Sequence, residues 1–257
     1  SGQHVTLMQS PAYSIVIPAY NESARITATL ERLLGYVAEQ RWDVEVIVVD
    51  DGSRDSTADI IRAYSEKNPR VRLLQNPKNR GKGYSVRNGM MHAHGEILLF
   101  TDADLSAPIE EANKLFAAIS NGADVAIGSR WLQSRLQSKR QPLYRQLFGR
   151  LLNLLLRLLL GLKLKDTQCG FKAFTRRAAK ALFPMQRIEG WTFDPELLYL
   201  AKKFGFRVAE VPVAWAHQEG TRIRLLRDGS RFLVELFVIR WNALRGRYAQ
   251  TAPAVNP

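Results

Sequence analysis

The segment ILLFTDAD, from Ile97 to Asp104, decides the fold class. It begins as a short apolar run typical of a buried strand and ends in two carboxylates. A carboxylate at a strand end needs a counter-ion, a metal or hydrogen-bond donors, because its removal from water costs free energy. Asp102 and Asp104 alternate along the chain, so with Ser106 they could present oxygen ligands to a divalent cation. A pair of helix-capping aspartates is the alternative interpretation.

Four further apolar runs, rich in β-branched residues, lie along the first 128 residues, and helical patterns separate them. The runs are Ser14–Ile17, Val44–Val49, Val71–Leu74 and Val125–Ile127. Ser23, Asp55 and Gly81 are expected to open helices that continue to Ala38, Ser65 and Ala93. This alternation predicts an α/β fold with a Rossmann-like, mostly parallel sheet and flanking helices. Functional residues should then gather at the carboxyl ends of the strands.

The composition is that of a globular protein with an excess of basic residues. The 257 residues are 46% hydrophobic and 24% charged, which excludes collagen-like, low-complexity and disordered classes. The formal net charge of +13 favours an anionic partner, such as nucleic acid, a phosphorylated substrate or an acidic lipid surface. The single cysteine, Cys169, predicts a reducing compartment, and we interpret it as a packed residue and not a nucleophile.

The segment Arg130–Lys165 is strongly basic, with nine Lys or Arg residues and no Asp or Glu. A helix is predicted near 142–161, with its polar residues on one stripe. These are Gln146, Arg150, Asn153 and Arg157. Nearly every other residue of Leu147–Leu160 is Leu or Phe, but the charges interrupt the run too often for a transmembrane helix. We expect this helix to lie in a membrane interface, with Leu155 and Leu159 on its apolar side.

A second stretch, Phe232–Leu244, has the same apolar character and is flanked by arginines. We expect a C-terminal amphipathic interface helix over 229–247, after a catalytic domain over 13–228. Flexible termini are expected at 1–12 and 248–257. In the alternative interpretation, both apolar helices are core helices that pack on each other or on a partner in an oligomer.

Seven short segments stand in one order along the chain. They are IPAYNE at 17–22, DDGS at 50–53, NRGKG at 79–83, DAD at 102–104, GSR at 128–130, DTQCGFK at 166–172 and WTFDPELLY at 191–199. This series resembles family 2 glycosyltransferases with the glycosyltransferase A fold. The last two segments are similar to the dolichyl-phosphate β-glucosyltransferase branch. They differ from the mannosyltransferase branch, whose middle segment usually lacks the Gln-Cys pair.

The resemblance implies a nucleotide pocket at the first strand ends. Its residues would be Pro18, Tyr20, Glu22, Asp50, Asp51, Lys82 and Asp102. Tyr20 would offer its ring to the base, and Glu22 would accept a hydrogen bond from the ribose or base. Asp51 would hold the base or ribose, while Asp50 supports the turn. Lys82 lies among glycines that let the backbone approach a pyrophosphate, and it adds a compact positive charge.

The resemblance also implies a catalytic set and a divalent metal, Mg²⁺ or Mn²⁺. The catalytic residues would be Asp102, Asp104, Arg130, Asp166 and Gln168. Asp104 would bind the metal, and Ser106, where mannosyltransferase relatives commonly have Gln, would be a ligand directly or through water. Asp166 and Gln168 would face the sugar hydroxyls or orient an arginine. The candidates for the acceptor phosphate are Arg130, Arg222 and Arg224, since guanidinium groups give bidentate phosphate contacts.

The implied activity is inverting transfer of glucose from UDP-glucose to a polyprenyl, dolichyl-type monophosphate. That phosphate is largely ionised near pH 7, so no strong general base is required, and the protein must neutralise and align two phosphate groups. GDP-mannose-dependent transfer is the alternative within the family. A basic nucleic-acid-binding module and an inactive membrane scaffold are alternatives from other classes. We expect peripheral attachment to the cytoplasmic face of a membrane, no signal peptide, no transmembrane helix and no nucleic-acid partner, and the oligomeric state stays open.

Overall fold

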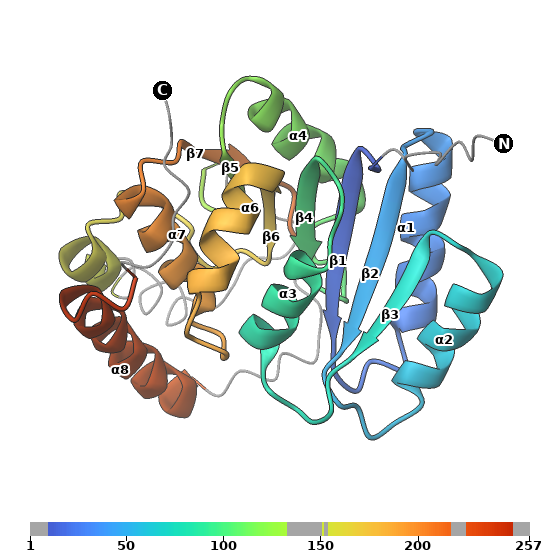
Figure 1. The fold of residues 1–257 in the computed structure, drawn as a ribbon, viewed down its shortest axis with the longest axis horizontal. Helices are drawn as coiled ribbons and strands as arrows, with labels where there is room; N and C mark the ends of the chain where they lie inside the picture. Colours follow the sequence, from blue (N-terminus) through green and yellow to red (C-terminus); the bar gives the residue numbers. More distant parts are fainter. Residues whose placement is uncertain (1–9, 133–150, 152–153, 217–224, 249–257) are drawn as a thin grey trace, which may run out of the picture.

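A seven-stranded sheet runs through the middle of the molecule, with helices on both of its faces (Figure 1). The structure is a computed structural model and describes residues 10–132, 151, 154–216 and 225–248. The strands are β1 (Tyr13–Ala19), β2 (Val44–Asp50), β3 (Val71–Gln75), β4 (Ile97–Thr101), β5 (Val125–Ser129), β6 (Phe171–Thr175) and β7 (Val208–Pro212). Their spatial order is β3-β2-β1-β4-β6-β5-β7. Strand β6 runs antiparallel to β4 and β5, whereas the other pairs are parallel, which confirms the predicted sheet.

Helices cover the two faces of the sheet in two groups. The α-helices are α1 (Ile26–Glu39), α2 (Thr57–Lys67), α3 (Lys82–Met91), α4 (Ala112–Ser120), α6 (Arg176–Leu182), α7 (Phe193–Lys203) and α8 (Leu225–Leu244), and residues 154–160 are also helical. Two short 3-10 helices, η1 (Ile109–Glu111) and η3 (Phe183–Met185), precede α4 and follow α6. One apolar core joins the sheet to α1, α2 and α4. The other joins it to α3, α6, α7, α8 and the 154–160 helix.

The spacing of apolar residues explains how a helix such as α1 packs on the sheet. Ile26, Leu30, Leu33 and Val37 recur at intervals of three or four residues, so they share one face of the helix, and all four are fully buried. Burying such a side chain contributes about 1.5–3 kcal/mol. The exposed opposite face of α1 carries polar residues such as Glu31 and Arg32. The amphipathic pattern therefore fixes which side of α1 meets β1 and its neighbours.

The predicted strands of the first half agree with β1 to β5 to within two residues at each end. Helices α1 and α2 begin later than predicted, and the difference is larger for α1, whereas α3 begins directly after Gly81, its N-cap, as predicted. Residues 22–25 form a turn instead, in which the backbone N–H groups of Arg25 and Ile26 both donate to the Glu22 carbonyl. The backbone N–H of Ser23 donates to Asp55 at 3.2 Å, so Ser23 links two loops and does not cap α1.

Two strands, β6 and β7, were not predicted. The β6 sequence FKAFT contains a lysine in its interior, which is unusual for a buried central strand. The β7 sequence VAEVP ends in proline and is half-buried. Both features suit β7 because it is an outermost strand of the sheet, where a missing backbone N–H is tolerated. Both strands follow the long basic segment, where strand–helix alternation no longer guides the assignment.

The 154–160 helix presents a different face to the core from the one we expected. Leu155 and Leu159 are partly buried and pack against the core, so placing them on the membrane side is wrong. Leu154 and Leu158 point outward, with 52% and 72% of their surface exposed. With leucine at almost every position, the sequence does not mark which stripe faces inward.

The expected domain limits fall partly outside the described residues. Residues 1–9 and 249–257 of the expected flexible termini lie there, as does 142–150 of the expected basic helix. Helix α8 begins at Leu225, so the expected boundary after 228 falls within it. Tyr248, expected to begin the flexible tail, is fully buried in the core shared with α7 and α8.

Candidate active site

The carboxyl ends of the parallel strands form one edge of the sheet, and the residues that follow them build the site. Residues 20, 51, 76, 102 and 130 come directly after β1 to β5. Because β6 is antiparallel, its amino end reaches the same edge, where register pairs Thr101 with Phe171. Gly170 is therefore placed beside Asp102, although 68 positions separate them in sequence.

Asp51 organises the loop that precedes α3. Its carboxylate accepts hydrogen bonds from the side chain of Asn76 (2.8 Å) and from the backbone N–H groups of Arg80 (3.0 Å) and Gly81 (2.8 Å). Asp51 is 4% exposed. Three donors on one buried carboxylate fix the loop that carries Lys82. The role expected for Asp51 toward a base or ribose stays a prediction.

The loops after β1 and β2 hold each other. The backbone N–H of Asn21 donates to the Ser53 hydroxyl at 2.9 Å, and that of Glu22 donates to the Thr57 hydroxyl at 2.8 Å. The backbone N–H of Ser53 donates to the Asp50 carboxylate at 3.3–3.4 Å, which is the turn-supporting role expected for Asp50. The region expected to receive the base, which includes Pro18 and Tyr20, is thus built on a braced pair of loops.

Lys82 and Asp102 form an ion pair at this edge. Nζ of Lys82 lies 2.5 Å from Oδ1 of Asp102, and the two side chains are 12% and 27% exposed. Burial alone would lower the pKa of Lys82, but attraction from Asp102 outweighs it and the pKa is raised. The ammonium also lies 5.1 Å from the centre of the Trp191 ring, and Trp191 is exposed. Lys82 is therefore a charged group at ordinary pH.

Two glycines allow the close approach of these elements. Gly81, just before α3, has a positive φ of 109°, and a Cβ there would meet the Glu189 carbonyl at 2.5 Å. A Cβ on Gly170 would overlap the carboxylate of Asp102. The glycines of the NRGKG and DTQCGFK segments are thus required by packing at the site.

Asp104 and Ser106 belong to a tight turn after β4. Oδ1 of Asp104 accepts the backbone N–H of Ser106 at 2.9 Å, and Leu105 between them has a φ of 47°. Ser106 is 3% exposed, and its carbonyl accepts the backbone N–H of Ala216. Asp102 and Asp104 are both partly exposed, so their carboxylates can meet a ligand.

The residues present fit a Mg²⁺ or Mn²⁺ ion. No cluster of three or more His, Cys, Asp or Glu residues that could hold a metal occurs within the described ranges. A site with one or two carboxylates, completed by phosphate oxygens and water, is the kind that Mg²⁺ uses. Asp104 is the candidate ligand through Oδ2, since Oδ1 is engaged by the turn.

Arg130 and Asp166 form the second charged pair of the edge. Nε and Nη2 of Arg130 donate to the two oxygens of Asp166 at 2.7 and 2.8 Å. Asp166 is 2% exposed. Burial would raise the pKa of Asp166, but Arg130 outweighs it and holds that pKa below its usual value. Trp215 lies 5.0 Å from the guanidinium, and the backbone N–H of Gln168 donates to Asp166 at 3.3 Å.

Behind these pairs lie buried charged residues that the sequence interpretation left without partners. Nζ of Lys172 lies 2.7 Å from Oδ1 of Asp194. Glu196 accepts the hydroxyl of Tyr248 at 2.6 Å and the backbone N–H groups of residues 187 and 188. Cys169 is buried, and burial raises its pKa to about 12, which opposes nucleophilic chemistry.

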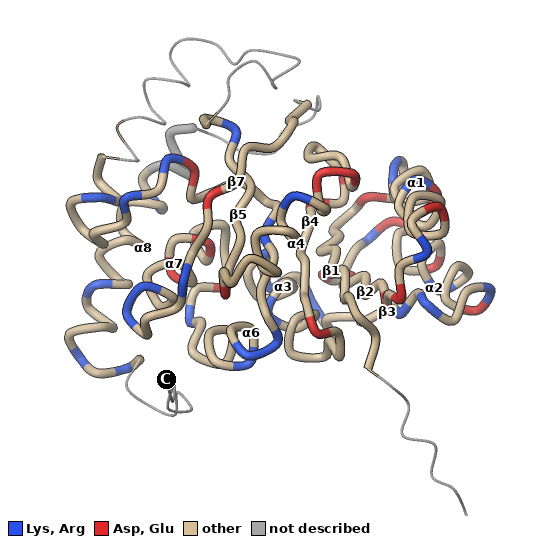
Figure 2. Tube along the Cα trace, turned by 90° about the horizontal axis from the view of Figure 1, so that it is seen from above, with Lys and Arg blue, Asp and Glu red and all other residues tan. Residues whose placement is uncertain are grey.

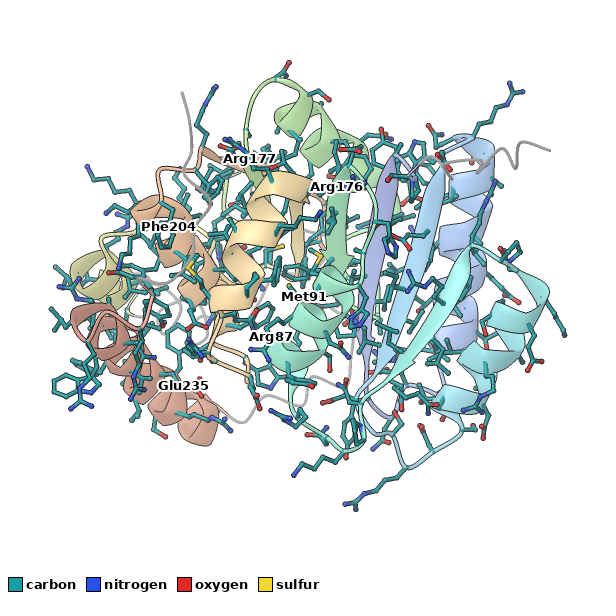
Figure 3. All side chains as sticks on the ribbon, in the orientation of Figure 1. Arg87, Met91, Arg176, Arg177, Phe204 and Glu235 are labelled. Atoms are coloured by element: carbon teal, nitrogen blue, oxygen red, sulfur yellow. The ribbon has the colours of Figure 1, made fainter. Side chains whose placement is uncertain are left out.

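The structure thus brings together most of the expected site residues at one edge. Arg222 and Arg224 lie outside the described residues, so their role toward an acceptor phosphate stays a prediction. Sequence reasoning missed the contributions of Asn76, Trp191 and Trp215, although Trp191 opens one of the quoted segments. Arg87, which donates to the Gln186 carbonyl at 2.9 Å and joins α3 to η3 behind the Lys82 loop, was also missed (Figure 3).

Comparison with known proteins identifies the family of the chain. The sequence model of glycosyl transferase family 2 matches residues 14–183, and the chain belongs to this family. It is 43% identical over 212 residues to dolichyl-phosphate beta-glucosyltransferase ALG5C of Trichomonas vaginalis, covering 79% of this chain and 63% of that protein. It is 34% identical over 248 residues to the human dolichyl-phosphate beta-glucosyltransferase, covering 91% and 76%. The chain therefore spans less than two thirds of the first relative and about three quarters of the second.

Solved structures share the fold at low sequence identity. Glucosyl-3-phosphoglycerate synthase from Mycobacterium tuberculosis, in complex with uridine diphosphate, has a TM-score of 0.65 at 22% identity, covering 96% of this chain and 83% of that chain. Mannosyl-3-phosphoglycerate synthase from Rubrobacter xylanophilus has a TM-score of 0.66 at 17% identity, covering 96% and 79%. The predicted glycosyltransferase A fold is confirmed.

Proposed function

We propose that this chain transfers glucose from UDP-glucose to a polyprenyl, dolichyl-type monophosphate with inversion at the sugar. The observation that carries the proposal is the presence of two ion pairs, Lys82–Asp102 and Arg130–Asp166, at one edge of a family 2 fold. The reaction brings a phosphate nucleophile to a sugar whose leaving group is a diphosphate. One fixed cation for each phosphate group is the arrangement that such a reaction requires.

We assign binding of the nucleotide-sugar donor to the part of the site at the carboxyl ends of β1 to β4. Lys82 opens α3, whose first backbone N–H groups and positive end favour a phosphate. Asp102 orients the ammonium and stays partly exposed for the sugar or ribose. The relatives' names, which specify glucosyl transfer, and the uridine diphosphate in a structural neighbour favour UDP-glucose over GDP-mannose.

A divalent metal at Asp104 would supply a second positive charge against the diphosphate. The M. tuberculosis synthase has been crystallised with Mn²⁺, uridine diphosphate and glucosyl-3-phosphoglycerate, at a TM-score of 0.65 and 21% identity. Asp104 in this chain stays partly exposed at the same edge as Lys82, which supports a cation there. We propose Mg²⁺ or Mn²⁺ as the cofactor.

The acceptor side is assigned to Arg130. Its guanidinium is held by Asp166 and lies near the ring of Trp215, so it is pre-oriented for a phosphate. Asp166 is itself anchored, because its backbone N–H donates to Glu210 at 2.8 Å. A pre-oriented guanidinium pays little ordering cost when the phosphate arrives.

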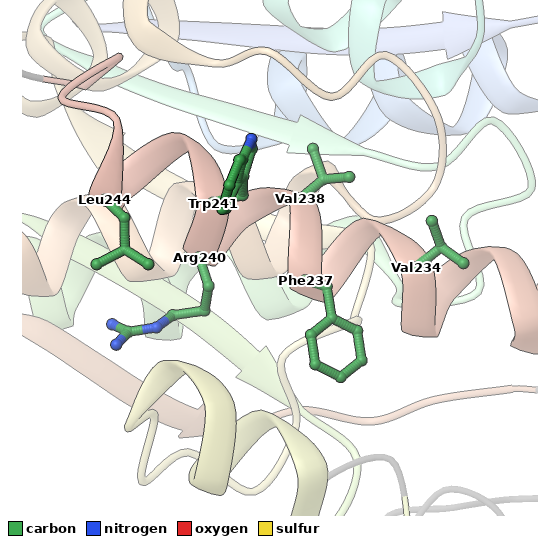
Figure 4. A pocket seen from close by; sticks show the side chains of 6 residues that line it. All are labelled: Val234, Phe237, Val238, Arg240, Trp241 and Leu244. Carbon is green, nitrogen blue, oxygen red and sulfur yellow. The ribbon is translucent and has the colours of Figure 1, made fainter.

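An apolar face on α8 is the proposed docking surface for a lipid membrane. Val234, Phe237, Val238, Trp241 and Leu244 are exposed along it and, with Arg240, line a hollow of about 510 Å³ (Figure 4). The opposite face of α8, with Leu236 and Ile239, is fully buried. No helix within the described residues is long and apolar enough to cross a membrane.

The charges around this face suit an anionic lipid surface. Arg231, Arg240 and Arg245 are exposed along and just after α8, and Figure 2 shows basic positions repeated along this helix. Glu235 on the same helix is paired with Arg231 at 2.9 Å (Figure 3). An apolar stripe with basic residues at its sides is typical of helices that lie in a membrane interface. Leu154 and Leu158 of the 154–160 helix are further exposed apolar residues, which we propose also contact the membrane.

The deciding experiment is a donor and acceptor panel. Purified protein is incubated with a polyprenyl monophosphate and UDP-glucose, UDP-galactose or GDP-mannose, with Mg²⁺ or Mn²⁺, and the lipid product is identified by mass. We expect a hexosyl phosphoryl lipid from UDP-glucose. Turnover with GDP-mannose alone would assign the chain to the mannosyl reaction. Absence of any lipid product, with tight binding to duplex DNA, would favour the nucleic-acid-binding alternative.

A further inference from the structure

A fully buried lysine lies behind the site without touching it. Lys172 is in the interior of β6, is 0% exposed, and lies opposite Phe100 of β4 in the sheet. Its Nζ lies 2.7 Å from Oδ1 of Asp194 and 2.5 Å from the carbonyl oxygen of Cys169. The ammonium is also 5.5 Å from the centre of the Phe100 ring.

A gain in folding stability does not explain why a buried ion pair occupies this position. A buried ion pair can often be replaced by packed apolar residues with little loss, because its desolvation offsets its Coulomb attraction. The neighbours of Lys172 on this face of the sheet include the buried core residues Phe174 on β6, Phe100 on β4 and Ile127 on β5, so an apolar residue would suit the position. The partners of the ammonium indicate what it does.

Each partner belongs to a segment that reaches the site. Cys169 is in the turn 166–170, which carries Asp166 at one end and Gly170 at the other. Asp166 holds Arg130, and the carboxylate of Asp102 rests against Gly170. The same turn therefore touches both charged pairs of the site.

Asp194 belongs to the second segment. It lies in the first turn of α7, three residues after Trp191, whose ring is 5.1 Å from the ammonium of Lys82. The charge of Asp194 also attracts Lys82. Lys172 thus fastens the turn 166–170 to the start of α7, and each of these segments contacts one or both charged pairs.

We propose that Lys172 and Asp194 are positioning residues that fix the turn 166–170 and so set the separation of Lys82–Asp102 from Arg130–Asp166. The inference rests on the proposed function, since that separation is the distance at which the two phosphate groups are held. The proposed role of the buried pair is to align the two phosphate-binding cations. A small displacement of reacting groups causes a large loss of rate.

The test replaces both charges at once. In the double variant Lys172→Met/Asp194→Leu no charge is left buried and unpaired, so the fold is expected to survive. Phe174→Leu is the matched control, because Phe174 is buried on the same face of β6 and packs against the rings of Phe100 and Phe183. Lys172→Gln/Asp194→Asn, which also leaves no charge buried and unpaired and keeps side chains of similar size, is the second variant if the first does not fold.

Two measurements separate alignment from stability. The first is the rate at which a thiol reagent labels Cys169, the single cysteine of the chain, which is buried. We expect the double variant to label several-fold faster than wild type well below its melting temperature, and Phe174→Leu to label at the wild-type rate. The second is steady-state kinetics with UDP-glucose and polyprenyl phosphate. We expect kcat to fall about 100-fold, with KM for the donor nearly unchanged.

The proposal is overturned if the double variant keeps the wild-type labelling rate and kcat, because the pair would then be only a part of the core. Equal losses in the double variant and in Phe174→Leu would also overturn it. Failure of the proposed function is distinguishable, since wild-type protein would then form no glucosyl lipid, while the labelling comparison would still show whether the pair fixes the turn.

Discussion

Arg130 and Asp166 lie 36 positions apart in the chain and meet as a bidentate ion pair, with N–O distances of 2.7 and 2.8 Å. The backbone N–H of Arg130 adds a third hydrogen bond to the same carboxylate at 3.0 Å. Each segment is thereby locked to the other, and the guanidinium plane is set before any ligand arrives. At position 130, a positive charge without the planar guanidinium group is therefore expected to be insufficient for activity.

Arg130→Lys is therefore expected to lower kcat/KM for the acceptor by about 100-fold, although the charge is kept, because an ammonium cannot make two parallel hydrogen bonds to a carboxylate or phosphate. Initial rates at varied polyprenyl phosphate check this. Arg177→Lys is the control, since Arg177 pairs with Asp124 before β5, at the opposite edge of the sheet (Figure 3). A variant with near wild-type acceptor kinetics would remove Arg130 from the acceptor site.

The same pair predicts a loss of stability in acid. The pKa of Asp166 is held below its usual value, so its contribution to the free energy of unfolding is present above about pH 5 and is lost progressively as the pH falls below that value. Asp166→Asn should cost about 3 kcal/mol at pH 7, because it removes the buried carboxylate that pairs with the largely buried Arg130 side chain. Urea unfolding from pH 2 to pH 7 checks this.

The difference between wild type and Asp166→Asn should shrink as the pH falls from 5 to 2. Asp59→Asn serves as the control, because Asp59 pairs with Arg62 on the surface and its side chain is 76% exposed. A pH-independent difference between wild type and Asp166→Asn would mean that the carboxylate is not the group that titrates.

Gly170→Ala tests the packing of Asp102. A methyl group at this position would overlap the carboxylate of Asp102, so the carboxylate must move away from Lys82. We expect kcat to fall by about 100-fold, with a loss of stability of about 1–3 kcal/mol. Gly35→Ala, on α1 with open space around it, should keep activity and gain up to about 1 kcal/mol. Normal turnover of Gly170→Ala would show that the position of Asp102 is not critical.

Metal dependence is tested at Asp104. Asp104→Asn keeps an oxygen able to accept the backbone N–H of Ser106, so the turn should persist. Turnover is expected to fall by about 100-fold or more, because a neutral amide is a weaker ligand for Mg²⁺ or Mn²⁺ than a carboxylate. Thermal melting of the variant checks the fold, and titration of Mn²⁺ checks binding. Full activity in excess EDTA would exclude the metal role.

The sequence predicted the first half of the fold well because strands and helices alternate there with clear signals. β1 to β5 are mainly apolar runs, and each is followed by a loop that contributes a residue to the candidate site. Strand β6 was missed because it contains Lys172, and its partner Asp194 lies 22 positions further on. The Lys172–Asp194 pair can be recognised only in the folded structure, where β6 lies between β4 and β5.

The site was predicted at the level of residues but not of their partners. Asp51 stands in a recognisable segment, yet only the fold shows that Asn76, Arg80 and Gly81 donate to it. The membrane-facing residues were the least predictable. Where leucine occupies both faces of a helix, as at 154–160, the inward side is decided by what packs against it.

The exposed stripe of α8 gives the test of membrane binding. Phe237→Glu and Trp241→Glu each place a negative charge at positions that are 60% and 54% exposed. Each is expected to weaken binding to anionic liposomes by several-fold or more without lowering the melting temperature, because an anionic surface repels the new carboxylate and about 0.8 kcal/mol is lost for each CH₂ no longer inserted. Co-sedimentation with liposomes measures this. Met91→Glu is the control, since Met91 is 50% exposed on α3 and outside the stripe.

Salt should weaken liposome binding only in part, because the arginine contribution is screened while the apolar contribution is not. Leu154→Glu and Leu158→Glu should behave like the α8 variants, whereas Leu155→Glu should lower the melting temperature, because that side chain packs against the core. If the α8 variants bind liposomes as wild type does and instead change the apparent mass in solution, the stripe is a contact between copies of this chain, and the lipid acceptor reaches Arg130 by another surface.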